Sequence, residues 1–341
     1  MWRYIPYSMY DSKSVYYRLN TVLSYNKHIN LLIGARGRGK TYPVKEYVIK
    51  HFIQNDEKFA WIRDNEASKD ELVMNDGQKF YEDVPLMKIY GFKEGNIKHG
   101  VFNINGKNAG YVLPASTYQK YKGNSYESVK TIVYDEFIPE KGTRKNKNNL
   151  LATINTFSTI ARHREDIKIF MMANALDRGD EFLEFLGVEI NDFGLYINDE
   201  KSIIIHYIDN SQAFNEKVTK GVIGKLLIGT PLEDNILSSK FTEKSDLFFD
   251  SLPTKSNLMF ILETNINKIR FYKSDNKLYV TPDYDGTKYL NKRYVLDIAD
   301  SMSYKPPLDL KTKNYIKEML KYNLIYFKND FVKRVVVDVF S

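Results

Sequence analysis

The sequence predicts an α/β protein whose N-terminal domain is built on a mostly parallel β-sheet. Apolar strand-like runs alternate with helical stretches through the first half of the chain, and a glycine-rich loop joins one such strand to a helix. After about residue 200 the strands become shorter, which predicts a smaller α+β domain. We expect a first domain over residues 1–200, a linker or lid region over 201–240, and a second domain over 241–341.

The elements of the first domain follow from hydrophobic periodicity. Residues 29–33 form an apolar run that leads into the glycine loop, and apolar positions at helical spacing predict a helix over 40–52. Pro43 is compatible with this helix because proline is tolerated in a first turn. Further strands are expected at 59–63, 131–134 and 167–173, with a hairpin over 101–113 that turns on Asn105-Gly106.

The second domain combines short strands with a basic charge. Strands are expected at 258–262, 268–272 and 277–280, then a helix over 313–326 and a last apolar run at 335–337. Residues 251–341 contain 16 Lys and Arg against 10 Asp and Glu, a net charge of +6 out of +7 for the whole chain. This excess indicates either a polyanionic partner such as nucleic acid or a solvated lysine-rich surface.

Composition excludes several classes of protein. The chain has no cysteine, which rules out disulfides and thiolate metal sites and suits a reducing cytoplasm. No apolar run approaches the roughly 18 residues of a membrane span, so we expect no membrane partner. The N-terminus has no apolar core followed by a small-residue cleavage site, so no signal peptide is expected.

A phosphate-binding loop is the most specific motif. The pattern G-x-x-x-x-G-K-[ST] is matched by Gly34-Ala35-Arg36-Gly37-Arg38-Gly39-Lys40-Thr41. Its backbone amides and the following helix N-terminus would bind the phosphates of a nucleotide. Lys40 would contact the β and γ phosphates of ATP, and the Thr41 hydroxyl would ligate Mg²⁺. The strand before the loop and the helix after it argue against a chance glycine turn.

A pair of carboxylates supplies the second half of such a site. Asp135 and Glu136 end the apolar strand at 131–134. Asp135 would hold Mg²⁺, and Glu136 would act as the base that polarises the attacking water. A glutamate beside the Mg²⁺ aspartate suits ATP-hydrolysing motors of the ASCE type (additional strand, catalytic glutamate), because small GTPases position water with glutamine.

Polar residues near the next strand are candidates for sensing or charge stabilisation. Asn174 ends that strand and would either sense the γ-phosphate or simply cap the strand. Arg162 and Arg164 precede it, and they would either stabilise transition-state charge from a neighbouring subunit or lie on the surface. Arg36 is a further cation, within the loop itself, that would act in cis.

Taken together, these motifs resemble a known family. The runs 33–40 and 131–138, Arg162-x-Arg164-Glu165 and Asn174-Ala175 look like the DNA-packaging ATPases of phi29-type tailed phages, which are terminase-like P-loop ring motors. The resemblance extends through most of residues 15–180, with motif order and spacing kept. Beyond residue 200 it is faint.

The resemblance implies an assembly and several roles. Family members are generally homopentameric rings that dock on the portal of an empty prohead in the host cytoplasm and drive double-stranded DNA through the ring with ATP. Arg162 falls at the position of the family's trans-acting arginine finger, and Lys122 at a basic position that faces the neighbouring subunit. In the phi29 group a prohead RNA is a further partner, and the sequence does not show whether this chain uses one.

Two alternatives to a pure motor stay open. The C-terminal domain resembles an RNase H-like nuclease fold that has lost its acidic metal cluster in this family. An active terminase-like nuclease is the first alternative. Its candidate carboxylates, Glu263, Asp297 and Asp338, are scattered and without a recognisable motif, which argues against it. A nucleotide-gated nucleic-acid scaffold is the second, although Glu136 argues against it. A basic loop at 141–147 is a candidate for DNA contact or a solvated loop.

Overall fold

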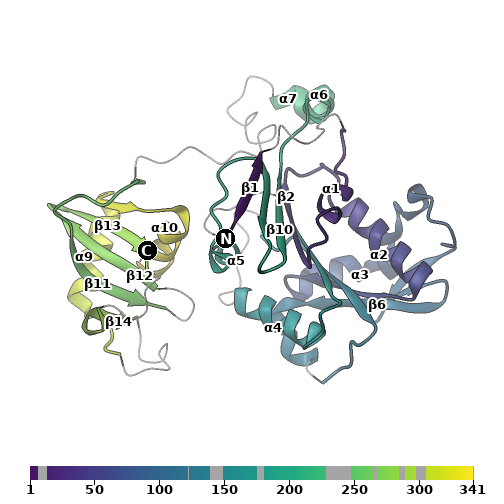
Figure 1. Cartoon of the computed structure of the whole chain (residues 1–341), viewed down its shortest axis with the longest axis horizontal. Coiled ribbons are helices and arrows are strands. Elements are labelled where there is room, and N and C mark those ends of the chain that lie inside the picture. The colour runs from purple at the N-terminus through teal and green to yellow at the C-terminus, as the bar shows by residue number, and fades with distance from the viewer. Residues whose placement is uncertain are drawn as a thin grey trace. The chain divides into compact units, whose positions relative to one another are not determined.

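The chain folds into two compact units (Figure 1). The computed structural model describes residues 1–6, 14–121, 123–138, 149–174, 180–227, 247–264, 268–283, 289–296 and 305–340. The first unit comprises Met1–Asp177 with Ile190–Phe241, and the second comprises Arg178–Glu189 with Thr242–Ser341. In the described part of the chain, no helix combines the length and apolar character needed to cross a bilayer.

A ten-stranded sheet organises the first unit. Its strands are, in order across the sheet, β1 (Arg3–Pro6), β9 (Gly194–Asn198), β10 (Ile203–Ile208), β2 (Ile29–Gly34), β8 (Lys168–Ala173), β7 (Val129–Asp135), β3 (Lys58–Arg63), β6 (Lys107–Pro114), β5 (Val101–Ile104) and β4 (Gly95–Lys98). The strands from β10 to β6 pair in parallel, and those outside them pair antiparallel. This confirms the predicted α/β fold with a mostly parallel sheet.

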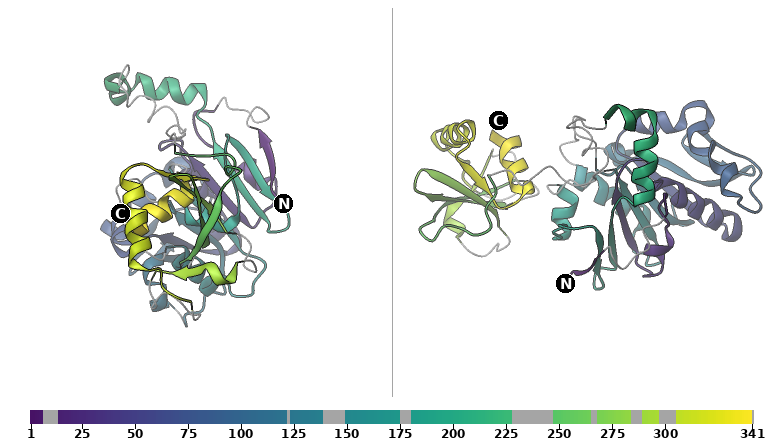
Figure 2. Two further views of the ribbon diagram at one scale, coloured as in Figure 1. Left: turned by 90° about the vertical axis from the view of Figure 1, so that its left-hand side faces the viewer. Right: turned by 90° about the horizontal axis from the view of Figure 1, so that it is seen from above.

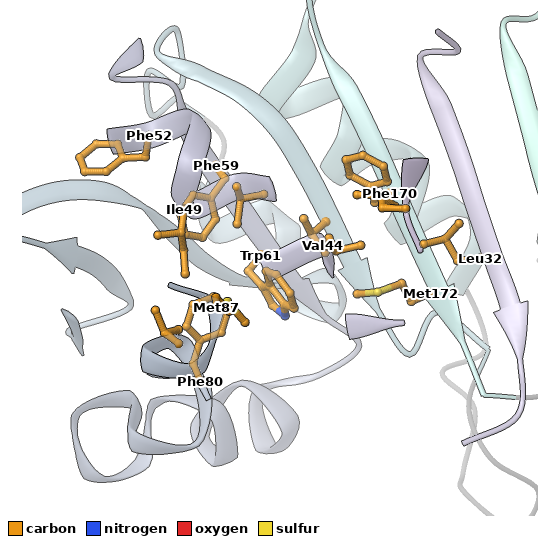
Figure 3. Packing of buried hydrophobic residues seen from close by; sticks show 14 of the residues in the cluster. Leu32, Val44, Ile49, Phe52, Phe59, Trp61, Phe80, Met87, Phe170 and Met172 are labelled. Atoms are coloured by element: carbon orange, nitrogen blue, oxygen red, sulfur yellow. The ribbon is translucent and has the colours of Figure 1, made fainter. Parts of the chain in front are cut away.

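Helices flank this sheet (Figures 1 and 2). They are α1 (Asn20–Leu23), α2 (Thr41–Asn55), α3 (Glu66–Tyr81), α4 (Asn149–Ala161), α6 (Gln212–Lys220) and α7 (Val222–Leu227), with the 3₁₀ turns η2 (Val84–Met87) and η3 (Ala115–Tyr121). Figure 3 shows the core between α2, α3 and the sheet, where Trp61 of β3 packs edge-on against Phe80 of α3 at 5.0 Å between ring centroids. Burial of such large rings is the main driving force for this layer.

The strand order brings the glycine loop and the acidic pair to the same edge of the sheet. β8 lies between β2, which leads into the glycine loop, and β7, which ends in the acidic pair. Because all three strands are parallel, their carboxyl ends meet at the same side of the sheet. The order also corrects the expected linker over 201–240. β10 lies inside that range, but it pairs with β2 and therefore belongs to the sheet.

The second unit has a five-stranded sheet of its own. Its order is β14 (Arg293–Val295), β11 (Asn257–Glu263), β12 (Lys268–Ser274), β13 (Lys277–Pro282) and β15 (Ile325–Phe327). The unit also contains α5 (Glu181–Leu186), the turn η4 (Leu290–Lys292), α9 (Leu310–Lys321) and α10 (Asp330–Phe340). The core lies between one face of the sheet and the helices α9 and α10.

One sequence-based boundary in the second unit was wrong. The expected helix over 313–326 ends at Lys321, and its last predicted residues form β15 instead. The apolar run at 335–337, which the sequence pattern assigned to neither a strand nor a helix, is part of helix α10. The reason is visible in the burial of Val332, Val336 and Phe340, which recur every four residues and so share one helix face.

Candidate functional site

The glycine loop has the conformation of an anion-binding nest. β2 ends at Gly34, and α2 begins at Thr41 after an N-cap at Lys40. Gly37 and Gly39 have φ of +83° and +73°, a left-handed conformation that side-chain-bearing residues rarely adopt. The two glycines turn the chain so that successive backbone amides converge at the N-terminus of α2, where anions are stabilised.

The Lys40 side chain is folded back over this loop. Its Nζ donates to the carbonyl oxygens of Gly34 at 2.8 Å and Ala35 at 2.9 Å. A third, longer bond of 3.3 Å reaches Asn174 Oδ1 beyond the end of β8. Burial lowers the pKa of Lys40 to about 8, against the opposing field of Asp135. The ammonium group therefore lies between the loop and the acidic strand end.

Asp135 and Glu136 share one guanidinium. Arg63, at the end of β3, donates from Nη1 to Asp135 Oδ2 at 3.0 Å and from Nη2 to Glu136 Oε2 at 2.9 Å. Burial raises the pKa of Asp135; Arg63 opposes that rise and Glu136 adds to it. Glu136 has a φ of +59°, a strained conformation for a residue with a side chain. Arg63 had not been predicted as a site residue, because its proximity follows only from the pairing of β3 with β7.

Asn174 connects the two halves of the site. Its Oδ1 accepts from Lys40, and its Nδ2 lies 3.5 Å from Glu136 Oε1. The amide therefore lies between the lysine of the glycine loop and the glutamate of β7. Asn174 thus contacts the lysine of the loop that follows β2 and the glutamate that follows β7, and its roles as sensor or strand cap both stay predictions.

These groups line a cavity of about 320 Å³. Its lining includes Arg36, Gly37, Gly39, Lys40, Thr41, Lys45, Arg63, Glu71, Asp135, Glu136 and Asn174. The Thr41 hydroxyl and the Asp135 carboxylate are oxygen donors in this shared lining, which is the ligand chemistry that Mg²⁺ prefers when phosphates complete its coordination. The described residues contain no group of three or more His, Asp or Glu side chains that would hold a metal without a nucleotide.

A second, more apolar cavity lies beside the first. It has a volume of about 900 Å³ and shares Gly39 with the first cavity, which is called the phosphate cavity below because the glycine loop lines it. Tyr16, Leu19, Leu23 and Tyr42 are among its lining residues. No sequence motif marks this cavity, because it forms where the segment around Tyr16 lies against the glycine loop.

The two arginines of the loop differ sharply. Arg36 is exposed and lines the phosphate cavity. Arg38 is buried, and its Nη1 donates to the carbonyl oxygens of Ser14 at 3.0 Å and Val15 at 2.6 Å and lies 3.2 Å from Ser211 Oγ. The Arg38 side chain therefore ties the loop to the N-terminal segment and to the N-cap of α6, and only its backbone is placed to contact phosphate.

Arg162 and Arg164, the arginines predicted to act on a neighbouring subunit, lie in different environments. Arg162 is exposed after the end of α4, contacts the Asn124 carbonyl oxygen at 3.2 Å, and is not among the residues that line the phosphate cavity. Arg164 donates to backbone carbonyl groups on both sides of it, including Glu127 at 2.6 Å and Ile160 at 2.6 Å, so it fastens the end of α4 to the segment before β7. Lys122 and the loop at 141–147 lie outside the described residues.

Two carboxylates of the second unit, Glu263 and Asp283, are paired with cations. Glu263 contacts Lys305 and Arg293, and these contacts hold its pKa below the usual value although burial opposes them. The buried Asp283 bonds Arg270 at 2.8 Å and Arg293 at 2.9 Å. Asp297 lies outside the described residues, and Asp338 is exposed on α10.

These features define a class of protein. A glycine loop joins a parallel strand to a helix, and an Asp-Glu pair ends a strand that is separated from it by one further strand with a polar residue at its end. This arrangement is typical of the ASCE-type P-loop NTPase fold.

Comparison with known proteins places the chain within this class. A profile of the family "Podovirus DNA encapsidation protein (Gp16)" matches residues 11–339. The chain therefore belongs to this family of phage DNA-packaging proteins. It is 28% identical over 338 residues to the DNA packaging proteins of Bacillus phages PZA and phi29, covering 96% of this chain and 98% of each relative. It is 30% identical over 285 residues to that of Bacillus phage B103, covering 82% of this chain and 86% of the relative.

Solved structures show the same fold. A chain of the bacteriophage phi29 genome packaging motor assembly aligns with a TM-score of 0.71 at 24% identity, covering 96% of this chain and 99% of that one. The N-terminal domain of the DNA packaging ATPase from phi29 aligns with a TM-score of 0.51 at 32% identity, covering 58% of this chain and 99% of that one. The first of these likenesses spans both units, which is consistent with the resemblance predicted from the motifs.

Proposed function

We propose that this chain is the ATP-hydrolysing subunit of a motor that moves double-stranded viral DNA into a prohead. The observation that carries the proposal is the connection from Lys40 through Asn174 to Glu136, beside the Asp135 carboxylate. A protein that merely held nucleotide would have little use for a glutamate placed as a base, which disfavours the gated-scaffold alternative.

Each side chain then has a distinct task. The loop amides and Lys40 bind the ATP phosphates, and Thr41 and Asp135 hold the Mg²⁺ ion that neutralises phosphate charge. Glu136 orients and deprotonates the attacking water. Lys40 exchanges its contacts with the loop carbonyls for phosphate oxygens on binding. The apolar cavity beside Gly39, with Tyr16 and Tyr42 in its lining, would receive the nucleobase.

Asn174 would report the loss of the γ-phosphate. Its amide contacts both Lys40 and Glu136, so removal of a phosphate that Lys40 binds would change both contacts together. The positions outside the described residues, Lys122 and 141–147, stay proposals for contact with a neighbouring subunit and with DNA.

Arg162 would complete the site of the adjacent subunit. It is exposed, and it does not line the phosphate cavity of its own chain. A homo-oligomeric ring, pentameric by resemblance, would therefore place this guanidinium against the neighbour's phosphates, where it would stabilise transition-state charge. The ring would act in the host cytoplasm while docked at the prohead portal, with a prohead RNA as a further candidate partner.

The nuclease alternative is disfavoured by charge. Two-metal cleavage needs several carboxylates free to bind cations. Glu263 and Asp283, in the second unit, are instead each bonded to arginine, with lysine also on Glu263. Both carboxylate oxygens of Glu263 and of Asp283 contact a cationic group, whereas Arg63 contacts Asp135 through Oδ2, so the second unit is proposed to contact nucleic acid or the portal without cutting.

Subunit mixing tests the motor and the trans arginine together. With proheads and linear DNA, Arg162→Ala protein is expected to bind ATP normally but to turn it over roughly 10³-fold or more slowly. Glu136→Ala protein is expected to be inactive as well. Mixtures of the two should recover part of the DNA-dependent ATPase rate, because some interfaces then combine an intact Glu136 with an intact Arg162.

The neighbouring exposed residue gives a matched control. His163→Ala should keep the full rate alone and should not rescue either inactive variant beyond dilution. Absence of rescue in mixed rings would reject the trans assignment while leaving the ATPase itself standing. Absence of any DNA-dependent turnover by the unmodified chain would reject the motor.

A further inference from the structure

Helix α3 is broken in its middle, and the break brings two charged residues together at the phosphate cavity. Residues 74–77 are not helical, and residues 75–77 have φ values of +52°, +55° and +79°, which is left-handed backbone. In an unbroken helix, positions 71 and 79 would lie about 12 Å apart along the axis, beyond the spacing at which helix side chains normally pair. The Lys79 ammonium instead donates to the Glu71 carboxylate, and both side chains line the phosphate cavity.

The part of α3 that follows the break is held firmly by its packing. Gly77 lies so close to β4 that a Cβ atom on it would be 2.5 Å from the Ile97 side chain. Phe80 is buried in the core (Figure 3), and its carbonyl oxygen accepts a hydrogen bond of 3.0 Å from Lys45 Nζ of α2. The backbone that carries Lys79 is therefore fixed relative to α2, the helix that begins at the glycine loop.

The ion pair of Lys79 differs in exposure from other ion pairs at this cavity. Lys45 and Arg63 each keep only 10% of their side-chain surface exposed while they contact their carboxylate partners. In the pair of Lys79 and Glu71, 61% and 55% of the side-chain surface is exposed. An exposed ion pair contributes little to stability, so Lys79 can leave Glu71 for another anion at little cost.

The pair lies on the side of the cavity that holds the acidic residues of β7. Lys79 holds the pKa of Glu71 below its usual value, and the field of the Arg63 guanidinium lowers it further, although burial opposes both. Arg63 itself bonds Asp135 and Glu136, the carboxylates proposed to hold Mg²⁺ and the attacking water. The phosphate that is attacked has to lie next to these two groups, which is the side of the cavity where Lys79 is placed.

We propose that Lys79 binds the terminal phosphate of the nucleotide in its own subunit, and that Glu71 is the partner it gives up when nucleotide binds. A phosphate oxygen is a charged acceptor like the Glu71 carboxylate, so the exchange keeps the ammonium group paired. The inference rests on the proposed binding of nucleotide at the glycine loop. It adds to Lys40 a second lysine that acts in cis, separate from any arginine of a neighbouring subunit.

Two substitutions with opposite effects test this exchange. The full chain is titrated in a calorimeter with Mg²⁺–AMP-PNP, which keeps a terminal phosphate, and with Mg²⁺–ADP, which lacks it. Lys79→Gln should weaken AMP-PNP binding about tenfold, because a hydrogen bond to a charged group is lost, and should leave ADP binding nearly unchanged. Lys79→Arg should restore most of the affinity. Glu71→Gln should tighten AMP-PNP binding about two- to fivefold, because the competing acceptor is removed.

An exposed lysine beside the same break provides the matched control. Lys98 lies 3.9 Å from Asp76, but it is not among the residues that line the phosphate cavity. Lys98→Gln should bind both nucleotides like the unmodified chain, and thermal unfolding of each variant separates lost binding from lost folding.

Three results would overturn the inference. Lys79→Gln could leave AMP-PNP binding unchanged, it could weaken ADP binding equally, or it could shift AMP-PNP binding in the same direction as Glu71→Gln, as loss of a merely structural ion pair would. Each of these leaves the nucleotide site itself standing. Failure of the unmodified chain to bind either nucleotide would instead reject the glycine loop as a nucleotide site, and this inference with it.

Discussion

At the scale of single residues, the acidic pair depends on one cation. Arg63 is the guanidinium that bonds Asp135 and Glu136 at the same time. Asp135 is largely buried, so its charge is costly without this partner. The same arrangement leaves both carboxylates in fixed positions before any nucleotide binds, which lowers the reorganisation that catalysis would require.

Removal of the Arg63 guanidinium should destabilise the first unit, and bound Mg²⁺–ADP should restore part of the lost stability. Arg63→Met is expected to lower the free energy of unfolding of the first unit by about 3 kcal/mol, because it leaves a buried carboxylate unpaired. Mg²⁺ and ADP should restore more stability to this variant than to the unmodified chain, since the metal supplies charge beside Asp135. Urea unfolding with and without Mg²⁺–ADP measures both effects, and equal ligand stabilisation of the two proteins would contradict the account.

At the scale of elements, β10 contains a histidine that the fold keeps neutral. His206 Nδ1 lies 3.3 Å from the hydroxyl of Tyr17, and burial lowers the pKa of His206 to about 3, with a further contribution from Arg38. Below about pH 6.5 the unfolded chain takes up a proton at this position that the folded chain does not. The stability present above pH 6.5 is therefore lost as the pH falls from 6.5 towards 3.

This linkage gives a measurable slope. Each pH unit below 6.5 should cost the first unit about 1.4 kcal/mol through His206 alone. His206→Gln should remove that part of the slope between pH 6.5 and 4.5, whereas His163→Gln, at an exposed position, should keep it. Urea midpoints measured across this range decide the matter, and identical slopes for both variants would show that His206 does not titrate in this way.

The sequence predicted those elements whose signal is local. The runs that became β2, β3, β7 and β8 are short, apolar and bounded by turn residues, and the loop motif is continuous in the chain. β1, β9 and β10 were not predicted; β1 and β10 take their places by pairing with strands that are distant in the sequence, β9 and β2 respectively. The three consecutive valines at 335–337 are compatible with either a strand or a helix. The four-residue spacing of the buried positions Val332, Val336 and Phe340 is what identifies the helix.

The same distinction applies to the site. Lys40, Thr41, Asp135 and Glu136 could be predicted because each follows directly from a strand end and a fixed spacing. Arg63 and the apolar cavity could not, since both arise from strand order and from a segment that folds over the loop from elsewhere.

At the scale of the whole molecule, the chain consists of two units with separate cores. Each sheet packs its own helices, and the two core clusters share no residue. Cooperative unfolding extends over a connected core, so two separate cores predict two unfolding steps. The residues that line the cavity beside the glycine loop all belong to the first unit.

Calorimetry of the intact chain should resolve these two steps. Phe271→Ala, a fully buried substitution in the second core, is expected to cost 3–5 kcal/mol and to lower one transition only. Mg²⁺–ADP should raise the other transition only. A single transition that responds to both changes would show that the units unfold as one.

The buried contacts of the Arg38 side chain should limit which residues can replace it. A motif search treats the four residues between Gly34 and Gly39 as interchangeable, but the structure does not. Arg36 is exposed, whereas Arg38 is buried against Ser14 and Ser211. A saturation library of the loop, selected for viable phage, tests this difference. Position 38 should tolerate almost as few substitutions as the glycines, and position 36 should tolerate many more. An unspecified position of the motif would then be nearly as restricted as the specified ones.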